Sequence, residues 1–323
     1  MRISIAMATY NGAPYIREQL QSFIDQTRQP DELIITDDGS CDETESIIRE
    51  FAKISPFAVT FQRNPRKLGY CGNFNAALML TDGDLVFLSD QDDVWFPEKI
   101  EHMVGVAERN PQAFLLMNDA ALTDGALREV GLSKLGQIKS AGLSMENFVM
   151  GCCCAIRREF LNICMPIPVG LKGHDNWLVR ISDAFKGRVV DPAILQYYRR
   201  HGSNESQFIA NSTKKVTRIQ KSLYLFRLLM QRKAITNLSE QLEQGKIFRE
   251  GISNILTTAP DQYRETLRLL QCDYQKRIEL TEQRLAIVQK SFFPRIVSAS
   301  TMLLYGGYRN ANGFRSMARD IIG

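Results

Sequence analysis

Short apolar runs alternate with amphipathic helical patterns along the first third of the chain, and this alternation constrains the fold more than any other feature. A strand that reaches the next strand through a helix pairs with it in parallel, because the helix carries the chain back across the sheet. The sequence therefore predicts an α/β fold with a mostly parallel sheet flanked by helices. The expected strands cover residues 3–8, 32–36, 58–62, 84–89 and 114–118, and the expected helices cover about 15–26, 44–54 and 73–80.

The pattern changes from about residue 207 onward, where no strong strand run occurs and apolar residues recur at helical spacing. Pro260 and Pro294 are expected helix breaks, because proline removes a backbone donor and clashes with the preceding turn. We expect one domain over 1–206 and a basic, mainly helical C-terminal extension over 207–323. The helical spacing is clearest at Ser222, Leu225, Phe226 and Leu229 and in the segments 235–242 and 263–289.

The charge of the chain is divided unevenly between these two parts. Residues 1–213 hold 21 Lys and Arg against 27 Asp and Glu, a net charge of −6, whereas residues 214–323 hold 19 against 9, a net charge of +10. A nucleic acid or an anionic membrane surface would match such a basic region. The basic segment 214–221 leads into the apolar residues 223–226, which is typical of a helix on a membrane surface. Packing on the first domain or on a second subunit is the alternative.

Several common protein classes are disfavoured by what the sequence lacks. It contains neither GxGxxG nor GxxxxGK[ST], the glycine-rich phosphate loops of dinucleotide-binding and P-loop proteins. No stretch free of charged residues exceeds 14 residues, short of the roughly 20 that cross a bilayer. Seven cysteines without a CxxC pair, and an N-terminus without a secretion pattern, favour the reducing cytoplasm. We interpret the adjacent Cys152, Cys153 and Cys154 as core residues on a strand rather than as metal ligands.

Three carboxylates, Asp90, Asp92 and Asp93, follow the expected strand 84–89 within four positions. Like charges this close repel one another unless a cation or a proton lies among them. Ligand sites in open α/β sheets lie at the carboxyl ends of strands, and Mg²⁺ and Mn²⁺ prefer carboxylate oxygens. The pattern therefore predicts a divalent metal site. A solvated acidic turn before the helix that begins near Pro97 is the alternative interpretation.

Two more strand ends are polar. Thr9, Tyr10 and Asn11 follow the first strand, and Asp37 and Asp38 follow the second. Because the carboxyl ends of parallel strands meet at one edge of a sheet, we expect all three polar strand ends to converge there. The second strand end also has a simpler interpretation, in which its polar residues cap the next helix and its glycine provides a turn.

In combination these segments resemble the inverting family 2 glycosyltransferases, which have the GT-A fold of nucleotide-diphospho-sugar transferases. The resemblance covers roughly residues 1–205, and no single motif carries it alone. The acidic motif has the form found in bacterial rhamnosyltransferase-like members. The matching segments are Ile5 to Gly12, Asp37-Asp38-Gly39-Ser40 with Asp42, Asp90-Gln91-Asp92-Asp93-Val94-Trp95, His174-Asp175-Asn176-Trp177, and Tyr198 to Asn204.

The resemblance also implies roles for individual residues. Asp175 is the expected catalytic base that takes the proton of the acceptor hydroxyl, with a helix N-terminal carboxylate as the alternative. Mn²⁺ or Mg²⁺ is expected at Asp92, Asp93 and His201, although a diphosphate contact and an ordinary loop residue remain open for the histidine. The expected donor contacts are Thr9, Tyr10, Asn11, Asp37, Asp38, Arg66, Asp90 and Asp92.

Three of these assignments have alternatives in solvation and packing. Arg66 is either a residue that steers the diphosphate or part of a solvated basic loop. Trp95 and Trp177 either offer a ring face to a sugar or anchor loops in the core.

The function implied by the resemblance is an inverting, metal-dependent glycosyltransferase that moves a sugar from a nucleotide-diphospho-sugar to a saccharide acceptor. The pathway is bacterial surface polysaccharide or lipopolysaccharide synthesis, and the donor is a dTDP- or UDP-sugar, with dTDP-rhamnose favoured by the motif that contains Gln91. A lipid-linked acceptor fits a cytoplasmic protein that is peripheral at the inner face of the membrane and has no nucleic acid partner. A homo-oligomer through the C-terminal helices is the other arrangement.

Two competing functions stay open beside it. One is a nucleotidyltransferase, which is disfavoured because its glycine- and arginine-rich phosphate loop is missing. The other is a non-catalytic sugar-nucleotide-binding or assembly module, which is disfavoured because the carboxylates Asp90, Asp92, Asp93 and Asp175 are intact.

Overall fold

The computed structural model describes residues 1–202, 204, 209–230, 233–309, 311 and 313–323. These residues form two compact units. The sheet unit comprises Met1–Ile167 and Gly173–Arg218, and the helical unit comprises Pro168–Lys172 and Ile219–Gly323. The expected boundary at 206/207 and Ser203 of the last motif lie outside the described residues, so the domain limits stay a prediction.

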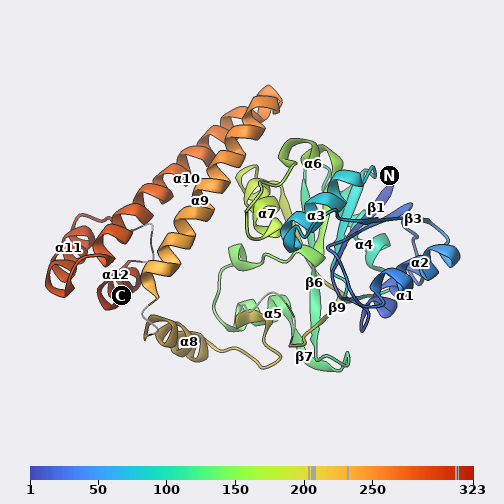
Figure 1. Ribbon diagram of the computed structural model, residues 1–323, viewed down its shortest axis with the longest axis horizontal. Coiled ribbons are helices and arrows are strands. Elements are labelled where there is room, and N and C mark those ends of the chain that lie inside the picture. The colour runs from blue at the N-terminus through green and yellow to red at the C-terminus, as the bar shows by residue number, and fades with distance from the viewer. Residues whose placement is uncertain (203, 205–208, 231–232, 310, 312) are drawn as a thin grey trace. The chain divides into compact units, whose positions relative to one another are not determined.

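The sheet unit is built on a mixed sheet, nine-stranded within the described residues, in the order β3-β2-β1-β4-β8-β6-β9-β5, with β7 beside β6 (Figure 1). Strands β3, β2, β1 and β4 are parallel, as the sequence predicts. Strand β8 then runs antiparallel to both β4 and β6, so the second half of the sheet is mixed rather than mostly parallel. The strands are β1 Ile3–Thr9, β2 Glu32–Asp37, β3 Ala58–Arg63, β4 Leu85–Ser89, β5 Val94–Trp95, β6 Leu115–Thr123, β7 Glu129–Ser133, β8 Cys154–Arg157 and β9 Arg188–Arg199.

Helices cover both faces of this sheet, which explains why β1, β2 and β4 are apolar almost throughout. On one face α1, α2 and α4 contribute their apolar stripes to a single core (Figure 1). On the opposite face α3 packs on β1 and β2, and α7 packs against α3. The helices of this unit are α1 Ile16–Ile24, α2 Thr44–Ile54, α3 Gly69–Leu80, α4 Lys99–Arg109, α5 Lys134–Ser140, α6 Arg158–Cys164 and α7 His174–Ala184.

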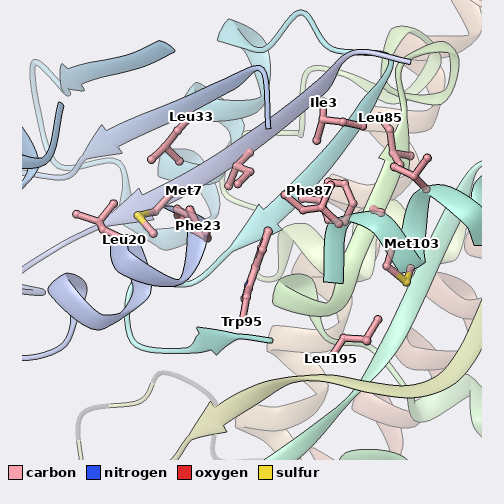
Figure 2. Packing of buried hydrophobic residues seen from close by; sticks show 14 of the residues in the cluster. Ile3, Met7, Leu20, Phe23, Leu33, Leu85, Phe87, Trp95, Met103 and Leu195 are labelled. Atoms are coloured by element: carbon pink, nitrogen blue, oxygen red, sulfur yellow. The ribbon is translucent and has the colours of Figure 1, made fainter. Parts of the chain in front are cut away.

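The core between the sheet and α1, α2 and α4 is centred on aromatic and aliphatic side chains from distant parts of the chain (Figure 2). Trp95 packs edge-on against Phe23, with 4.9 Å between the ring centroids, and lies 5.7 Å from the centroid of Phe87. Met103 from α4 and Leu195 from β9 belong to the same cluster. This packing fixes strand β4, which precedes the acidic motif, and Trp95, with which the motif ends.

The cysteine assignment needs one correction. Cys152 and Cys153 lie in a short 3-10 turn, Gly151–Cys153, and only Cys154 belongs to strand β8. All three thiols are buried and free, as expected for core residues. The alternation of side chains along a strand therefore does not apply to Cys152.

The helical unit contains two long helices that pack side by side, α9 and α10, with α11 and α12 beside the end of α10 (Figure 1). A buried ion pair ties α10 to α12: Arg284 donates Nε and Nη2 to the two carboxylate oxygens of Asp320, both at 2.8 Å. Tyr308 donates its hydroxyl to the same carboxylate at 2.8 Å. The helices are α8 Arg218–Met230, α9 Ala234–Thr258, α10 Asp261–Val288, α11 Phe292–Leu304 and α12 Phe314–Ile322.

The predicted α-helical character of the C-terminal part is confirmed. Helix α8 exposes Ile219, Leu223 and Phe226, while the side chains of Leu225 and of residues 228–230 lie outside the described set. Among the described residues, no helix combines the length and apolar character needed to cross a bilayer.

Candidate active site

The polar ends of β2, β1 and β4 lie next to one another, because these strands are neighbours in the sheet. Thr9 is in register with Asp37, and its hydroxyl donates to the Asp37 carboxylate at 2.9 Å. Asn73 of α3 donates its side-chain amide to the Thr9 carbonyl at 3.0 Å. The expected convergence of the three strand ends is therefore present, and hydrogen bonds fix the position of two of them.

Both aspartates after β2 are buried and hold loops in place. One carboxylate oxygen of Asp37 accepts the backbone N–H groups of Gly39 and Ser40, at 3.1 and 2.8 Å. Asp38 accepts the backbone N–H groups of Leu68 and Gly69, at 2.7 and 2.8 Å, and so fixes the start of α3. These contacts give both residues a positioning role, and their direct contact with a donor stays a prediction.

Gln91 fixes the loop that follows β1. Its side-chain oxygen accepts the Tyr10 backbone N–H at 2.9 Å, and its amide donates to the Tyr10 carbonyl at 3.0 Å. A Cβ at Gly12 would lie 2.3 Å from the Gln91 amide oxygen, so a larger residue there would displace the Gln91 side chain. Asn11, between Tyr10 and Gly12 in the loop, has a positive φ of 47°, and its side-chain oxygen accepts the Cys41 backbone N–H at 2.9 Å. The acidic motif and the first loop are thus one connected structure.

Asp90 and Asp93 lie close together, and the Cys152 thiol completes a group whose ligand atoms are all within 4.8 Å of one another. Burial and the nearby Asp92 carboxylate together raise the pKa of Asp90 to about 7. Burial and the carboxylates of Asp92 and Asp90 raise the pKa of Asp93 well above its ordinary value. A cation among these groups would relieve the repulsion that raises both pKa values.

Asp93 is hydrogen-bonded to a buried chain of polar side chains. Gln196 of β9 donates its amide to Asp93 at 2.8 Å and accepts a hydrogen bond from the ammonium of Lys99. Lys99 also donates to the Cys152 carbonyl at 3.0 Å, and its ammonium lies 3.9 Å from the centroid of the Trp95 ring. Burial lowers the pKa of Lys99, although the nearby Asp93 carboxylate acts in the opposite direction.

Asp92 faces a different set of partners. Its carboxylate lies 2.7 Å from Nε2 of His201 and accepts the side-chain amide of Asn204 at 3.0 Å. The His201 ring stacks on Tyr15 with 4.4 Å between centroids. Arg199 donates Nε to the Asp92 carbonyl at 2.8 Å. The structure thus brings together two of the predicted metal ligands, Asp92 and His201, in a direct contact with each other.

Asp175 lies in the first turn of α7, where its carboxylate accepts the Asn176 backbone N–H at 2.8 Å. The charge of Asp175 contributes to the raised pKa of Asp90, so these two carboxylates are coupled electrostatically. Next to it, His174 is buried and stacks on Phe74 with 4.0 Å between centroids. Neither ring nitrogen of His174 has a hydrogen-bond partner among the described residues.

The remaining candidates lie at the surface or in the core. Arg66 is exposed on the loop after β3, beside Lys67, whose ammonium lies 3.8 Å from the centroid of the Tyr10 ring. Trp95 is buried in the core, and Trp177 is buried with its indole N–H donating to the Cys164 carbonyl at 2.7 Å. The two tryptophans are therefore core anchors, and the interpretation of either as a sugar-facing platform is wrong.

Comparison with known proteins settles the family. The model of the family described as Glycosyl transferase family 2 matches residues 4–163. An uncharacterised glycosyltransferase of Nostoc sp. is 30% identical over 227 residues, which cover 66% of this chain and 69% of that protein. This chain belongs to glycosyl transferase family 2.

Two further relatives have more specific names. The dTDP-rhamnosyl transferase RfbG of Shigella flexneri is 37% identical over 102 residues, which span 30% of this chain and 35% of that protein. The UDP-Glc:alpha-D-GlcNAc-diphosphoundecaprenol beta-1,3-glucosyltransferase WfaP of Escherichia coli is 28% identical over 216 residues, 67% of this chain and 83% of that protein.

A solved structure confirms the GT-A fold. The structure of TarS residues 1–349 of S. aureus with UDP-GlcNAc superposes with a TM-score of 0.56 at 15% identity, over 100% of this chain and 90% of that one.

For this family 2 chain, the sequence analysis missed three residues that border the acidic motif. Cys152 and Gln196 come from a turn and a strand far from Asp93 in the sequence, whereas Lys99 lies at the start of α4, soon after the motif. Lys99 and Gln196 resemble ordinary surface residues in composition, and Cys152 resembles a core residue. The antiparallel insertion of β8 and the return of β9 bring Cys152 and Gln196 to the site.

Proposed function

We propose that this family 2 glycosyltransferase is an inverting, metal-dependent enzyme. It transfers a sugar from a nucleotide-diphospho-sugar to a saccharide acceptor in the synthesis of a bacterial surface polysaccharide or lipopolysaccharide. The observation that carries the proposal is the grouping of the Asp90 and Asp93 carboxylates after β4, beside the polar ends of the neighbouring strands β1 and β2, in a chain of this family. Pathway and substrates are proposals that go beyond family membership.

The acidic group fits a divalent cation by the chemistry of its donors. Asp92, Asp93 and His201 would hold Mn²⁺ or Mg²⁺; Asp92 contacts His201 directly, and Asp93 lies close to Asp90, which would be a further ligand. Cys152 is a weaker candidate, because burial raises the pKa of its thiol and a protonated thiol is a poor ligand for these hard cations. When bound, the metal supplies positive charge to the diphosphate leaving group.

The residues of the chain itself would position the donor. Thr9, Tyr10 and Asn11 line the strand end beside the Asp37 and Asp38 loops, so this edge would receive the nucleoside. Arg66 on the neighbouring loop would face the phosphates, where a guanidinium can pair with two oxygens.

Asp175 would take the proton from the acceptor hydroxyl as that oxygen attacks the anomeric carbon. The hydroxyl is a weak nucleophile near neutral pH, and a carboxylate within hydrogen-bond reach activates it during the attack. A direct displacement on the side opposite the leaving nucleoside diphosphate inverts the anomeric configuration. The half-buried position of Asp175 at the start of α7 leaves its carboxylate accessible to a hydroxyl group.

The donor is proposed as a dTDP- or UDP-sugar, with rhamnose from dTDP-rhamnose favoured. Similarity of the acidic motif supports rhamnose, and RfbG is named as a dTDP-rhamnosyl transferase. The name of WfaP gives UDP-Glc as donor and a diphosphoundecaprenol-linked sugar as acceptor, which supports a lipid-linked acceptor for this chain as well. A protein that acts on such an acceptor would work in the cytoplasm, peripheral at the inner face of the membrane.

A panel of dTDP- and UDP-sugars tests the proposal with the full-length protein. We expect one donor to raise the melting temperature only when Mn²⁺ or Mg²⁺ is present, because a ligand that binds the native state stabilises it by mass action. The same donor should release nucleoside diphosphate slowly in the presence of the metal. Activity that depends on pyrophosphate would instead indicate a nucleotidyltransferase, and binding without any turnover or acceptor transfer would indicate a non-catalytic module.

A further inference from the structure

Helices α11 and α12, at the end of the helical unit, carry a cluster of exposed apolar side chains. Leu304 is 85% exposed and Tyr305 is 88% exposed, values typical of flexible polar residues rather than of large apolar ones. We name this cluster the α11–α12 surface. Its exposed apolar members are Phe292, Phe293, Val297, Leu304, Tyr305 and Phe314.

Three of these residues form one stripe along α11. At 100° per residue, Phe293, Val297 and Leu304 lie within about 40° of one another around the helix axis. Ala299, which is fully buried, lies on the opposite side of the same helix. Helix α11 therefore packs on its neighbours through one face and turns large apolar side chains away from them, with Ser300 and Thr301 between Val297 and Leu304, which is uncommon for a helix at the surface of a soluble protein.

The charged residues within the segment 290–323 are almost all basic. Residues 290–323 contain five basic residues and a single acidic one, Asp320. Asp320 is fully buried, and Arg284 and Tyr308 occupy its carboxylate. The acid in this segment thus contributes nothing to the outer surface, where Arg309 and Arg315 are exposed.

The apolar face continues into a groove between α10 and α11. The groove has a volume of about 440 Å³, and Ile287, Val297 and Met302 line it together with Lys290. Val297 belongs to both the groove and the exposed stripe, so the two form one continuous apolar feature with a basic residue beside it.

We infer that the α11–α12 surface docks on an anionic phospholipid membrane. Aromatic and aliphatic side chains flanked by Arg and Lys, without an exposed acid, have the composition of an interfacial membrane-binding element. A second copy of the chain fits this surface less well, because a symmetric contact would place the basic residues of one copy against those of the other. The inference stands apart from the transfer reaction, although it agrees with the lipid-linked acceptor proposed above.

Sedimentation of the full-length protein with vesicles, without donor or metal, tests the inference. We expect binding to vesicles that contain phosphatidylglycerol, little binding to pure phosphatidylcholine vesicles, and weaker binding at high salt. The triple variant F293S/V297S/L304S should lose at least about tenfold in partitioning. The double variant R309E/R315E should lose roughly 30-fold or more, since each basic residue near the surface contributes to anionic lipid binding.

A matched control removes the same number of exposed apolar side chains elsewhere. Ile54, Ile235 and Leu269 are exposed on α2, α9 and α10, and I54S/I235S/L269S should bind vesicles as the wild type does. Binding that survives in F293S/V297S/L304S, or that is lost equally in the control, overturns the inference. Far-UV circular dichroism checks that every variant is folded.

Insertion can be observed directly with a fluorescent residue. Both native tryptophans, Trp95 and Trp177, are buried, so F293W adds an exposed indole to a constant background. We expect vesicles with brominated acyl chains to quench F293W and to leave L269W unchanged. If no quenching occurs, and analytical ultracentrifugation shows an oligomer that F293S/V297S/L304S dissociates, the surface is a protein interface and the inference is wrong. These outcomes do not depend on whether the proposed function is correct.

Discussion

Both units of this chain bury charged groups, but like charges lie close together in the sheet unit, whereas large apolar side chains are exposed in the helical unit. At the strand ends of the sheet unit, the carboxylates of Asp37, Asp38 and Asp93 are buried, and each accepts hydrogen bonds from groups on other elements or loops. In the helical unit the charge pair of Arg284 and Asp320 is buried, and large apolar side chains of α11 face outward. One unit thus encloses charge at a defined place, and the other exposes apolar surface at a defined place.

Each unit therefore has a feature that folding alone does not require. Buried carboxylates with raised pKa values destabilise a fold unless a ligand compensates, which supports the cation proposed for the sheet unit. Exposed apolar side chains also destabilise a free protein in water, so the helical unit is shaped for a partner that covers them. Substitutions in each unit test whether its feature affects that unit alone.

The largest effect is expected from Asp93. Because its carboxylate is buried close to that of Asp90, where a cation would compensate both, D93N should abolish metal-dependent transfer, and D92A should do the same. D93N should also remove the rise in melting temperature that Mn²⁺ gives in the presence of nucleoside diphosphate. The variant D82A is the control, since Asp82 is exposed before the opposite end of β4. Full activity in both D92A and D93N would rule out this metal site.

Asp320 should govern the stability of the helical unit alone. Removal of one partner from a buried ion pair leaves an uncompensated charge, so D320A should lower the free energy of unfolding by about 3–5 kcal/mol. Urea unfolding followed by circular dichroism measures this loss, and donor protection of the sheet unit should persist. The paired change R284M/D320L should recover much of the stability, because neither charge is then left alone. A loss in R284M/D320L as large as in D320A would contradict this account.

A smaller effect, on turnover and not on binding, is expected from Asp175. The variant D175N keeps the shape of the side chain but cannot accept a proton, so turnover should fall by about 10²-fold or more. Metal-dependent protection by the donor should remain, because the base contacts the acceptor. Turnover equal to that of the wild type would place the base elsewhere in the sheet unit.

Sequence alone predicts the elements whose pattern is local. The five predicted strands and the helices α1 to α3 lie within a few residues of their expected bounds, and the helix over 44–54 matches α2 at both ends. Strands β5, β7, β8 and β9 were not predicted, because β5, β7 and β8 have two to five residues and β9 pairs with register shifts and carries a charged, irregular sequence. The family motifs identify Asp90, Asp92 and Asp93, whereas long-range packing brings Gln196 to Asp93.

The same limit applies to the C-terminal part, where charge and helical spacing indicate a surface but not its location. The sequence indicates a membrane-surface helix at 214–226, and α8 does expose apolar residues there. The stripe on α11 becomes visible only when the buried side of that helix, marked by Ala299, is known. A contact of α8 with a membrane stays a prediction beside the α11–α12 surface.

The smallest effect is expected from His174, which combines features of both units: it is a polar group, yet it is buried among aromatic rings without a hydrogen-bond partner in the described part of the chain. Burial lowers its pKa below the ordinary 6.5, although the Asp175 carboxylate acts in the opposite direction. As the pH falls through about 6.5, the unfolded chain takes up the proton first, so the folded state loses stability by at most about 1.4 kcal/mol per pH unit. H174L should remove this part of the pH dependence and raise stability by about 1 kcal/mol at neutral pH, because it no longer buries unpaired ring nitrogens. F74L is the control, since it weakens the same packing without removing a titratable group and should lower stability equally at pH 7 and pH 5. Thermal unfolding at a series of pH values measures all three proteins, and a pH dependence in H174L as steep as in the wild type would contradict a lowered pKa of His174 in the folded protein.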